Sequence, residues 1–309
     1  MVLDVEFEPV YSAMPPSNVF ADLAAARTAL SAVSGDGRSD DAVRVEERSV
    51  APGGNALTAR VYTPVSRGAG PLPVAVWMHG GGFVVGAPNA EDDTCRRLAG
   101  ELGIAVVAPD YRLAPEHPYP AAFDDCYATL TWVGEEGGAL GFDTSRLALG
   151  GHSAGAALAA SVAIAAADRA GPSIRFVYLG YPVLSDRTDT ESACSITDPR
   201  LFNRDGLKAM WNAYLKDGGP DSGYAVPARA ADLTGLPPMY LMVAGVDPAR
   251  DDALAFAARL SAAGNQVELH LVPGVPHMFP ALAPAIRASR RAVAAWTSAF
   301  AHGIGADRG

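Results

Sequence analysis

Short apolar runs alternate along most of this chain with segments of helical character. Three of the runs, Val74–Met78, Ile104–Val107 and Met239–Val243, are apolar at every position instead of at every second position. Strands with that pattern are typically buried on both faces, as in a mostly parallel sheet that is covered by helices. The alternation therefore predicts an α/β protein with a doubly wound sheet.

The predicted elements follow this alternation from about residue 44 onward. Strands are expected at Val43–Val50, Leu57–Tyr62, Val74–His79, Ile104–Pro109, Arg146–Leu149, Ile174–Leu179, Met239–Ala244 and Val267–Val272. Helices are expected at Asp92–Leu102, Ala121–Gly134, Ala154–Arg169, Arg250–Ala263 and Pro284–Ala301. Because no helix separates the first two strands, we expect the sheet to start as an antiparallel meander.

Two segments fall outside the alternation. Residues 1–42 contain a predicted helix at Val19–Val33 and then a polar turn at Ser34–Asp41. Residues 185–236 form a long insertion with a predicted helix at Arg204–Lys216. An unstructured connection of that length is uncommon in a compact domain, so we expect the insertion to fold as a lid over an active site. The 309 residues are expected to form a single domain, to which these two segments contribute a cap.

The composition excludes several classes of protein. Hydrophobic residues make up 49% of the chain and charged residues 19%, which is enough apolar material for a folded core. The net charge of −10 disfavours nucleic acid as a partner, because it repels a phosphate backbone. The apolar runs are too short to span a membrane, and the acidic N-terminus lacks the features of a signal peptide. We therefore expect a cytoplasmic protein that has no membrane partner.

The cysteines Cys95, Cys126 and Cys194 are widely spaced, and none belongs to a CxxC pair or a Cys/His cluster. A structural zinc site normally shows one of those spacings. We expect free and mostly buried thiols, and no metal site.

The strongest chemical signal is the string Gly151-His-Ser153-Ala-Gly155, which lies between a predicted strand and an alanine-rich helix. Small residues two positions before and after a serine let the chain turn sharply, so that the serine Oγ is exposed at the edge of the sheet. The pattern predicts that Ser153 is a nucleophile. The alternative is a glycine-rich turn in which Ser153 only caps the helix.

A nucleophilic serine needs a base, and the base needs an orienting carboxylate. Asp247 and His277 follow the last two predicted strands, in the order Ser, Asp, His that this architecture requires. We expect His277 to be the base and Asp247 the acid. A position directly before a proline is also typical of a helix N-cap, and Asp251 is the second candidate for the acid.

Acyl transfer also needs hydrogen-bond donors for the oxyanion. A glycine run, His79-Gly-Gly-Gly82-Phe83, follows the strand that begins at Val74. Glycines let backbone N–H groups approach a substrate oxygen without a Cβ in the way. We assign the N–H groups of Gly81, Gly82 and Ala154 to an oxyanion hole and expect His79 to brace the loop. The alternative is a flexible loop.

Aromatic residues and methionines near these motifs are candidates for the lining of an acyl or alcohol pocket. The alternative is packing within the cap. The candidates are Phe83, Tyr181, Phe202, Met210, Trp211, Met278 and Phe279.

Three motifs together resemble the hormone-sensitive-lipase-like branch of the α/β-hydrolases, whose bacterial members are carboxylesterases. They are the glycine run at His79–Gly82, the run Asp110–Asp125, and the pair formed by Asp247–Asp251 and Pro276–Phe279. The resemblance covers about residues 45–300. It implies an α/β-hydrolase fold with an eight-stranded, mostly parallel sheet, flanking helices and a small helical cap. It also implies hydrolysis of short acyl esters by a Ser–Asp–His triad, no metal or other cofactor, and a homodimer formed through the sheet edge.

The sequence departs from the pattern of this branch at three positions. His152 stands before the serine, where an acidic or small residue is usual, and Ala156 and Met278 replace common glycines. The string Gly151–Ala156 is more similar to some arylformamidases of the same superfamily. An amide or formamide hydrolase with the same triad is therefore the alternative function. A lactone or carbamate hydrolase and a non-catalytic ligand receptor are further alternatives. The Asp110–Asp125 run is expected to be structural, held by Asp110, Arg112 and Glu116.

Overall fold

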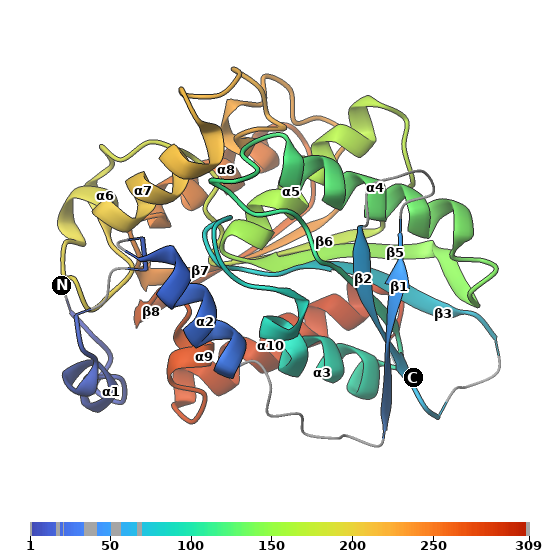
Figure 1. Ribbon diagram of the computed structural model, residues 1–309, viewed down its shortest axis with the longest axis horizontal. Coiled ribbons are helices and arrows are strands. Elements are labelled where there is room, and N and C mark those ends of the chain that lie inside the picture. The colour runs from blue at the N-terminus through green and yellow to red at the C-terminus, as the bar shows by residue number, and fades with distance from the viewer. Residues whose placement is uncertain are drawn as a thin grey trace.

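The computed structural model describes most of the chain, in residues 2–16, 19–20, 22–33, 42–50, 57–66 and 70–306. The polar turn expected at Ser34–Asp41 lies outside these residues. Figure 1 shows helices on both sides of one central sheet, as expected for a doubly wound fold.

The sheet has eight strands in the order β1-β2-β4-β3-β5-β6-β7-β8. β1 pairs with β2 and β2 with β4 in antiparallel fashion, and all later pairs are parallel. The antiparallel start is as expected, but it is not a simple meander, because β4 instead of β3 lies beside β2. The strands are β1 (Val43–Ser49), β2 (Thr58–Pro64), β3 (Leu72–Met78), β4 (Ala105–Pro109), β5 (Phe142–His152), β6 (Phe176–Gly180), β7 (Met239–Val246) and β8 (Val267–Pro276).

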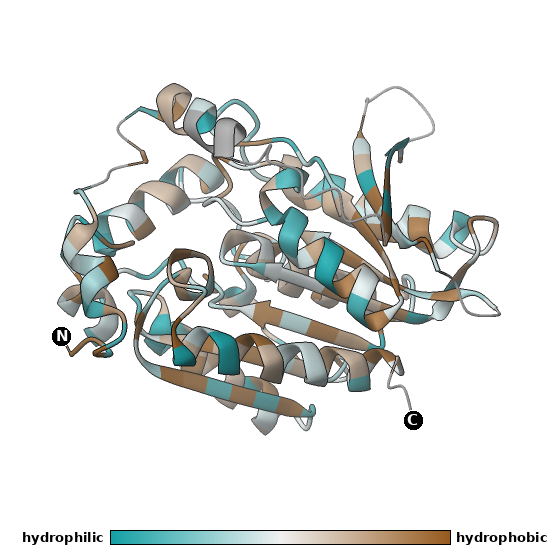
Figure 2. Cartoon of the chain, turned by 90° about the horizontal axis from the view of Figure 1, so that it is seen from below, coloured by the Kyte–Doolittle hydropathy of each residue, from teal (hydrophilic) through white to brown (hydrophobic). Residues whose placement is uncertain are grey.

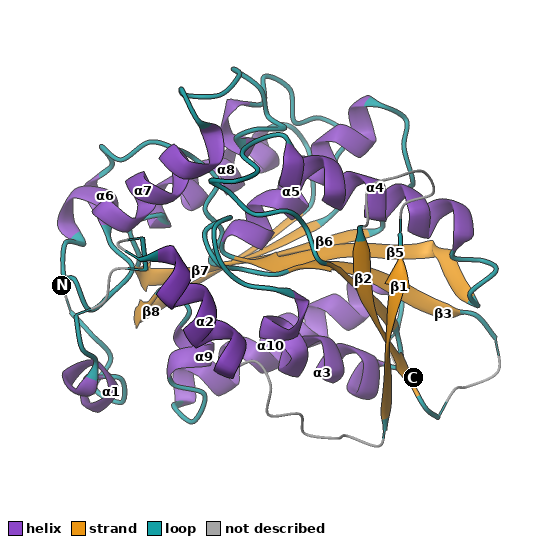
Figure 3. Cartoon of the chain, in the orientation of Figure 1, coloured by secondary structure: helices purple, strands orange, loops and turns teal. Residues whose placement is uncertain are grey.

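The helices lie in two layers and in a group near the carboxyl ends of the strands (Figure 3). One layer contains α4 (Ala121–Glu136), α5 (Ala154–Asp168) and α8 (Arg250–Ala262), and the other contains α3 (Asp92–Leu102) and α10 (Arg287–Ile304). The remaining helical segments are α1 (Glu8–Ala13), α2 (Leu23–Val33), η1 (Pro88–Glu91), α6 (Glu191–Ser195), α7 (Arg204–Leu215), η2 (Pro227–Arg229) and α9 (Phe279–Leu282).

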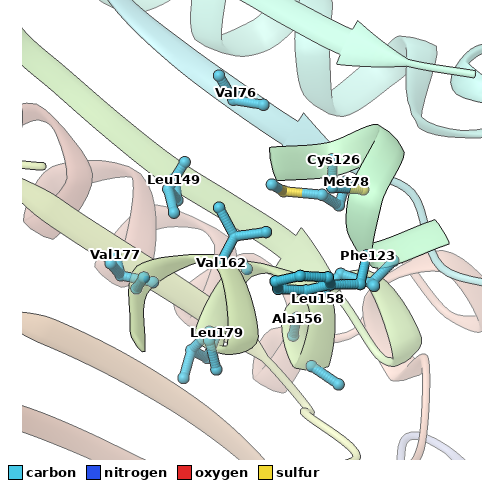
Figure 4. Close-up of a cluster of buried hydrophobic side chains, with 14 of the residues drawn as sticks. Val76, Met78, Phe123, Cys126, Leu149, Ala156, Leu158, Val162, Val177 and Leu179 are labelled. Carbon is cyan, nitrogen blue, oxygen red and sulfur yellow. The ribbon is translucent and has the colours of Figure 1, made fainter. Parts of the chain in front are cut away.

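The continuous apolar pattern of β3 follows from its burial on both faces. Successive side chains of a strand point to opposite sides, so Val76 and Trp77 enter different clusters of the core. Val76 packs in the same cluster as Leu158 and Val162 of α5, as Figure 4 shows. Trp77 faces the other layer, where its ring lies 5.8 Å from that of Trp296 on α10. All seven residues of β3 are buried.

Several predicted boundaries need correction. β5 begins at Phe142 instead of Arg146, because the chain pairs with β3 before the apolar run starts. α2 begins at Leu23 instead of Val19, since the Asp22 carboxylate accepts a hydrogen bond from the N–H of Ala25 and caps the helix there. α10 begins at Arg287 instead of Pro284, and its first N–H donates to the Glu6 carboxylate at 2.6 Å.

The two segments that fall outside the strand–helix alternation both reach the loop that follows β3. Phe20 and α2 pack against a cluster that includes Val84 and Val85 of this loop. Met210 and Trp211 of α7 lie in the core cluster that contains Phe83. Their action as a cap remains a prediction. Among the described residues, no helix combines the length and apolar composition needed to cross a bilayer.

Candidate active site

Ser153 lies at the sharp turn between the end of β5 and the start of α5, with φ 56° and ψ −117°. The two glycines that lie two positions before and after it are required by close packing. A Cβ at Gly155 would overlap the carbonyl oxygen of Met78, and one at Gly151 would lie 2.6 Å from the same oxygen. The Gly-x-Ser-x-Gly spacing therefore lets the turn pack directly against the end of β3.

A continuous hydrogen-bonded chain joins Ser153 to His277 and Asp247. The Oγ of Ser153 lies 2.7 Å from Nε2 of His277, and Nδ1 of the same ring lies 2.6 Å from Oδ2 of Asp247. All three are buried, with exposed fractions of 6%, 4% and 2%. In this arrangement the imidazole can take the hydroxyl proton while the carboxylate fixes the ring and stabilises its positive charge.

The contact of Asp247 with His277 is present, but Asp247 is not the N-cap of α8, because that position is occupied by Ala249. Oδ2 contacts His277, while Oδ1 accepts a hydrogen bond from the N–H of Ala249 at 2.9 Å, just before α8 begins. Asp251, the second candidate for the acid, instead accepts a hydrogen bond from the N–H of Ser192 at 2.7 Å and supports α6. The structure therefore brings Asp247, and not Asp251, to His277.

The loop after β3 presents free backbone donors beside the serine turn. Gly81 has φ 121°, and a Cβ there would overlap the carbonyl oxygen of Val85, so only glycine fits. Gly82 has φ 61°. Within the described part of the chain, the N–H groups of Gly81, Gly82 and Ala154 have no hydrogen-bond acceptor. A Cβ at Gly155 would also lie 2.5 Å from the carbonyl oxygen of His79, which shows how closely the loop packs on the turn.

His79 holds the start of this loop. Its Nδ1 lies 2.7 Å from the carbonyl oxygen of Gly80, and its ring stacks on that of Tyr111 with a centroid separation of 4.0 Å. The hydroxyl of Tyr111 in turn donates to the His79 carbonyl oxygen at 2.7 Å. Burial lowers the pKa of His79 to about 4, so the ring is neutral at pH 7. These contacts are consistent with a bracing role.

The predicted pocket residues lie at different distances from the triad. Tyr181 and Phe202 contact the ring of His277, with centroid separations of 5.0 and 4.5 Å. Met210 approaches the loop, since a Cβ at Gly82 would lie 3.2 Å from its Cγ. Met278 follows His277 directly and is 44% exposed.

Three further candidates pack into the interior. Phe83 is buried, stacks on Tyr214 at 3.9 Å and lies 5.3 Å from Trp211, so both candidates belong to the packing of α7 on the loop. Phe279 lies in the core cluster on the α10 side of the sheet. Contact of any of these side chains with substrate remains a prediction.

Two residues near the site carry no signal in the sequence that would have identified them. A Cβ at Gly82 would lie 3.3 Å from Cζ of Phe20, which comes from the N-terminal segment. Glu91 lies 2.9 Å from Nδ1 of His152 through its Oε2, although the two are far apart in the chain. Only the folded chain brings these side chains to the site.

The Asp110–Asp125 run ends within α4, and the side chains of Arg112 and Glu116 hold it as expected. Within the described part of the chain, Asp110 contributes only a backbone bond. The Arg112 guanidinium donates to both carboxylate oxygens of Asp125, at 2.9 and 2.7 Å. Glu116 pairs with Arg27 of α2 at 2.8 Å, and Asp110 joins β2 through its backbone N–H.

Comparisons with known proteins agree with this geometry. A family model described as the alpha/beta hydrolase fold matches residues 75–281. The carboxylesterase NlhH of Mycobacterium tuberculosis is 39% identical over 256 residues, which cover 81% of this chain and 80% of that protein. The esterase LipI of the same organism is 38% identical over 243 residues, which cover 78% of this chain and 76% of LipI.

Similarity in three dimensions extends over nearly the whole chain. The solved structure of a bacterial heroin esterase superposes with a TM-score of 0.92 at 38% identity and covers 98% of each chain. The motifs, the fold and these relatives together show that the chain belongs to the hormone-sensitive-lipase-like esterases of the α/β-hydrolase family.

Proposed function

We propose that this chain is a serine carboxylesterase that hydrolyses short-chain acyl esters through an acyl-enzyme intermediate. The observation that carries the proposal is the buried hydrogen-bonded chain Ser153–His277–Asp247, with distances of 2.7 and 2.6 Å, beside free backbone donors. Its membership of an esterase family supports the same reaction class. The small-molecule partner is the ester, and the triad chemistry uses no cofactor.

The reaction proceeds in two acyl-transfer steps. His277 removes the Ser153 proton as Oγ attacks the ester carbonyl, while Asp247 holds the ring and stabilises the imidazolium. The oxyanion accepts hydrogen bonds from the N–H groups of Gly81, Gly82 and Ala154. The alcohol leaves with the proton held by His277. Water then attacks the acyl-enzyme by the same route and releases the acid.

The side chains packed around the reacting groups support a preference for short acyl chains. Ser153 is only 6% exposed, and Phe202 lies over the ring of His277 at 4.5 Å. Phe20 and Met210 both approach Gly82, so side chains of both cap segments lie close to the donors. We therefore expect these side chains to restrict the length of the acyl chain.

The test compares p-nitrophenyl butyrate hydrolysis by the wild type and by Ser153→Ala. We expect turnover in the wild type and a loss of about 10⁴-fold or more in the variant, because the nucleophile is gone. The control is Ser161→Ala, which removes another buried hydroxyl from α5, one that hydrogen-bonds Gly223 at 3.3 Å, and should stay active. A wild type that prefers matched anilides or N-formyl substrates would favour the amidase alternative, and an active Ser153→Ala variant would contradict the mechanism.

We further propose a homodimer formed through β8. This strand ends the sheet, and Leu269 and Leu271 are 41% and 47% exposed on it. Figure 2 shows alternating hydrophobic and hydrophilic bands along this edge strand at the bottom of the view. An open edge with exposed leucines favours pairing with a second copy. Light scattering after size exclusion should show a dimer for the wild type and a monomer for Leu269→Lys/Leu271→Lys, and a monomeric wild type would overturn the proposal.

We also propose a cytoplasmic location. The free thiols support it, because Cys95 and Cys126 are buried and unpaired and Cys194 is exposed and unpaired. Fractionation of the source cells should recover the esterase activity with cytoplasmic markers.

A further inference from the structure

One carboxylate lies between the serine turn and the oxyanion loop. Glu91 is the last residue of η1, and its two oxygens have different partners. Oε2 lies 2.9 Å from Nδ1 of His152, and Oε1 accepts a hydrogen bond from the N–H of Gly80 at 3.4 Å. The side chains of Glu91 and His152 are only 13% and 11% exposed.

The partners of Glu91 are the immediate neighbours of the reacting groups. His152 precedes the nucleophile Ser153, and Gly80 precedes Gly81, the first assigned oxyanion donor. The two backbones also touch, because a Cβ at Gly80 would lie 3.2 Å from the carbonyl oxygen of His152. Glu91 therefore contacts both of the chain segments that carry Ser153 and the oxyanion donors.

The ring of His152 is fixed on every side. It stacks on Tyr181 with a centroid separation of 4.9 Å and meets the edge of Trp77 at 5.2 Å. Its Nε2 lies 3.4 Å from the hydroxyl of Tyr178. A Cβ at Gly180 would overlap its Cδ2, so the glycine leaves room for the ring. A ring held in this way presents Nδ1 to Glu91 in one orientation only.

The charges favour the same contact. Burial acts to raise the pKa of Glu91, but the interactions with His152, with the N–H of Gly80 and with His79 together outweigh burial, and the pKa lies below the ordinary value of a glutamate. Glu91 is therefore ionised at neutral pH and can accept hydrogen bonds through both oxygens. A charge-assisted bond of this kind is shorter and stronger than one between neutral groups.

We propose that Glu91 and His152 are a positioning pair that sets the distance between Ser153 and the oxyanion donors. Neither side chain contacts the reacting atoms, and the pair acts through the backbone of its neighbours. The inference rests on the proposed esterase function and assigns to it two residues outside the triad. Transition-state stabilisation depends on donor placement within a fraction of an ångström, so loosening the pair lowers kcat more than it raises KM.

The experiment measures kcat, KM and thermal stability for Glu91→Ala, His152→Ala and the double variant, with p-nitrophenyl butyrate as the probe. We expect kcat to fall about 10- to 100-fold in each single variant while KM changes less than about 2-fold. The double variant should be no slower than the worse single variant, because both changes remove the same link. Additive losses in the double variant would overturn the proposal.

Two conservative variants refine the test and guard against misfolding. His152→Asn keeps an amide N–H near the position of Nδ1, so it should recover most of the activity lost in His152→Ala. Glu91→Gln keeps the shape of the side chain but offers one carbonyl oxygen to two donors, so it should lie between wild type and Glu91→Ala. If His152→Asn is as slow as His152→Ala, the contact with Glu91 is not what matters, and the pair is refuted.

The matched control removes the carboxylate of Asp143, which lies at the opposite end of β5 from His152. Asp143 accepts hydrogen bonds from Ser145 and Arg146 at the start of β5, whereas His152 ends β5. Asp143→Ala should lower the melting temperature and leave kcat unchanged. If Glu91→Ala behaves like Asp143→Ala, its role is only structural and the proposal fails.

A fluorophosphonate probe separates failure of this inference from failure of the proposed function. Labelling of Ser153 needs the nucleophile and the oxyanion donors but no ester substrate. If the wild type hydrolyses no ester yet is labelled, the esterase proposal fails, and slower labelling of Glu91→Ala and His152→Ala still supports the pair. Labelling of these variants at the wild-type rate would refute the pair alone. A wild type that is neither active nor labelled would refute both.

Discussion

Ser153 holds its backbone at φ 56° and ψ −117°, a conformation that costs a residue with a Cβ about 1–3 kcal/mol. The neighbouring structure keeps it there. Its N–H donates to the carbonyl oxygen of Gly180 at 2.9 Å, and its own carbonyl oxygen accepts from Ala157 at 3.1 Å. The strain is therefore offset by hydrogen bonds on both sides of the residue, and it directs the side chain toward His277 at 2.7 Å.

The tight fit at Gly155 gives a first prediction. In Gly155→Ala the new methyl group would overlap the carbonyl oxygen of Met78, and neither backbone can move without shifting the end of β3. We expect a loss of about 3 kcal/mol or more in the free energy of unfolding, measured by urea denaturation. The control is Gly138→Ala, where a Cβ meets nothing within 4 Å and the change should stay within about 0.5 kcal/mol. Equal effects of the two substitutions would contradict this account of the serine turn.

His79 gives a second prediction, on stability against pH. Its pKa is lowered by burial from 6.5 to about 4 in the folded protein. Between these values the unfolded chain binds a proton that the folded chain does not, so stability falls as pH falls from about 6.5 to about 4. The contribution of this residue over that range is about 3 kcal/mol.

Urea denaturation at several pH values between 4 and 7 tests this contribution. His79→Asn keeps a donor to Gly80 but has no titrating ring, so it should lose stability less steeply than the wild type in acid. Parallel pH profiles for the two proteins would show that His79 does not titrate as its burial requires.

Among the elements, those with a continuous local pattern were predictable. α3 has the predicted bounds Asp92–Leu102, because a polar start and a left-handed Gly103 mark its two ends in the sequence. The short helices were missed, since tertiary contacts stabilise them. α6 has only five residues, and its N-terminal N–H groups are satisfied by the side chains of Thr190 and Asp251. Such helices carry too few residues for a recognisable period.

The same distinction applies within the site. The motifs around Ser153, Asp247 and His277 are local, and each follows its own strand. The order of these motifs in the sequence was therefore enough to predict the hydrogen bonds among the three residues. The pocket was less predictable because its lining depends on how α7 packs. The ring of Phe83, for example, is covered by Tyr214 at 3.9 Å.

Asp252, a residue of α8, gives a third prediction. This carboxylate lies in the first turn of the helix and is only 8% exposed, and burial raises its pKa from 3.8 to about 6. A raised pKa means that the folded state binds the proton more tightly than the unfolded state does. The stability that Asp252 contributes is therefore fully present below about pH 4 and is lost as pH rises through about 6.

Asp252→Asn removes this penalty. We expect it to be more stable than the wild type at pH 8 by about 2–3 kcal/mol and to differ little at pH 4, where the wild-type carboxyl is protonated. Urea denaturation at the two pH values provides the measurement. A variant that is less stable than wild type at pH 8 would show that the charge of nearby Arg187, which favours the ionised form, dominates at this position.

Across the whole molecule, the N-terminal segment joins parts of the chain that are distant in sequence. The N–H of Asp4 donates to the carbonyl oxygen of Gly274 at 2.8 Å, within the strand that leads to His277. Glu6 pairs with Arg287 at the start of α10, and the hydroxyl of Tyr11 donates to Asp198 at 2.5 Å beyond α6. The segment therefore contacts the strand that leads to the base His277, the last helix and the insertion.

Phe7 anchors this segment, because its side chain is fully buried in the core cluster on the α10 side of the sheet. Phe7→Ala should lower the free energy of unfolding by about 3–5 kcal/mol, the usual cost of removing a buried phenylalanine side chain. Val5→Ala is the matched control, since Val5 is 79% exposed and its truncation should cost almost nothing. If the segment unfolds together with the rest of the protein, the urea midpoint of Phe7→Ala falls while the m-value stays constant. An unchanged midpoint would mean that the segment detaches on its own, so its contacts with Gly274 and Asp198 would add nothing to the stability of the domain that carries His277.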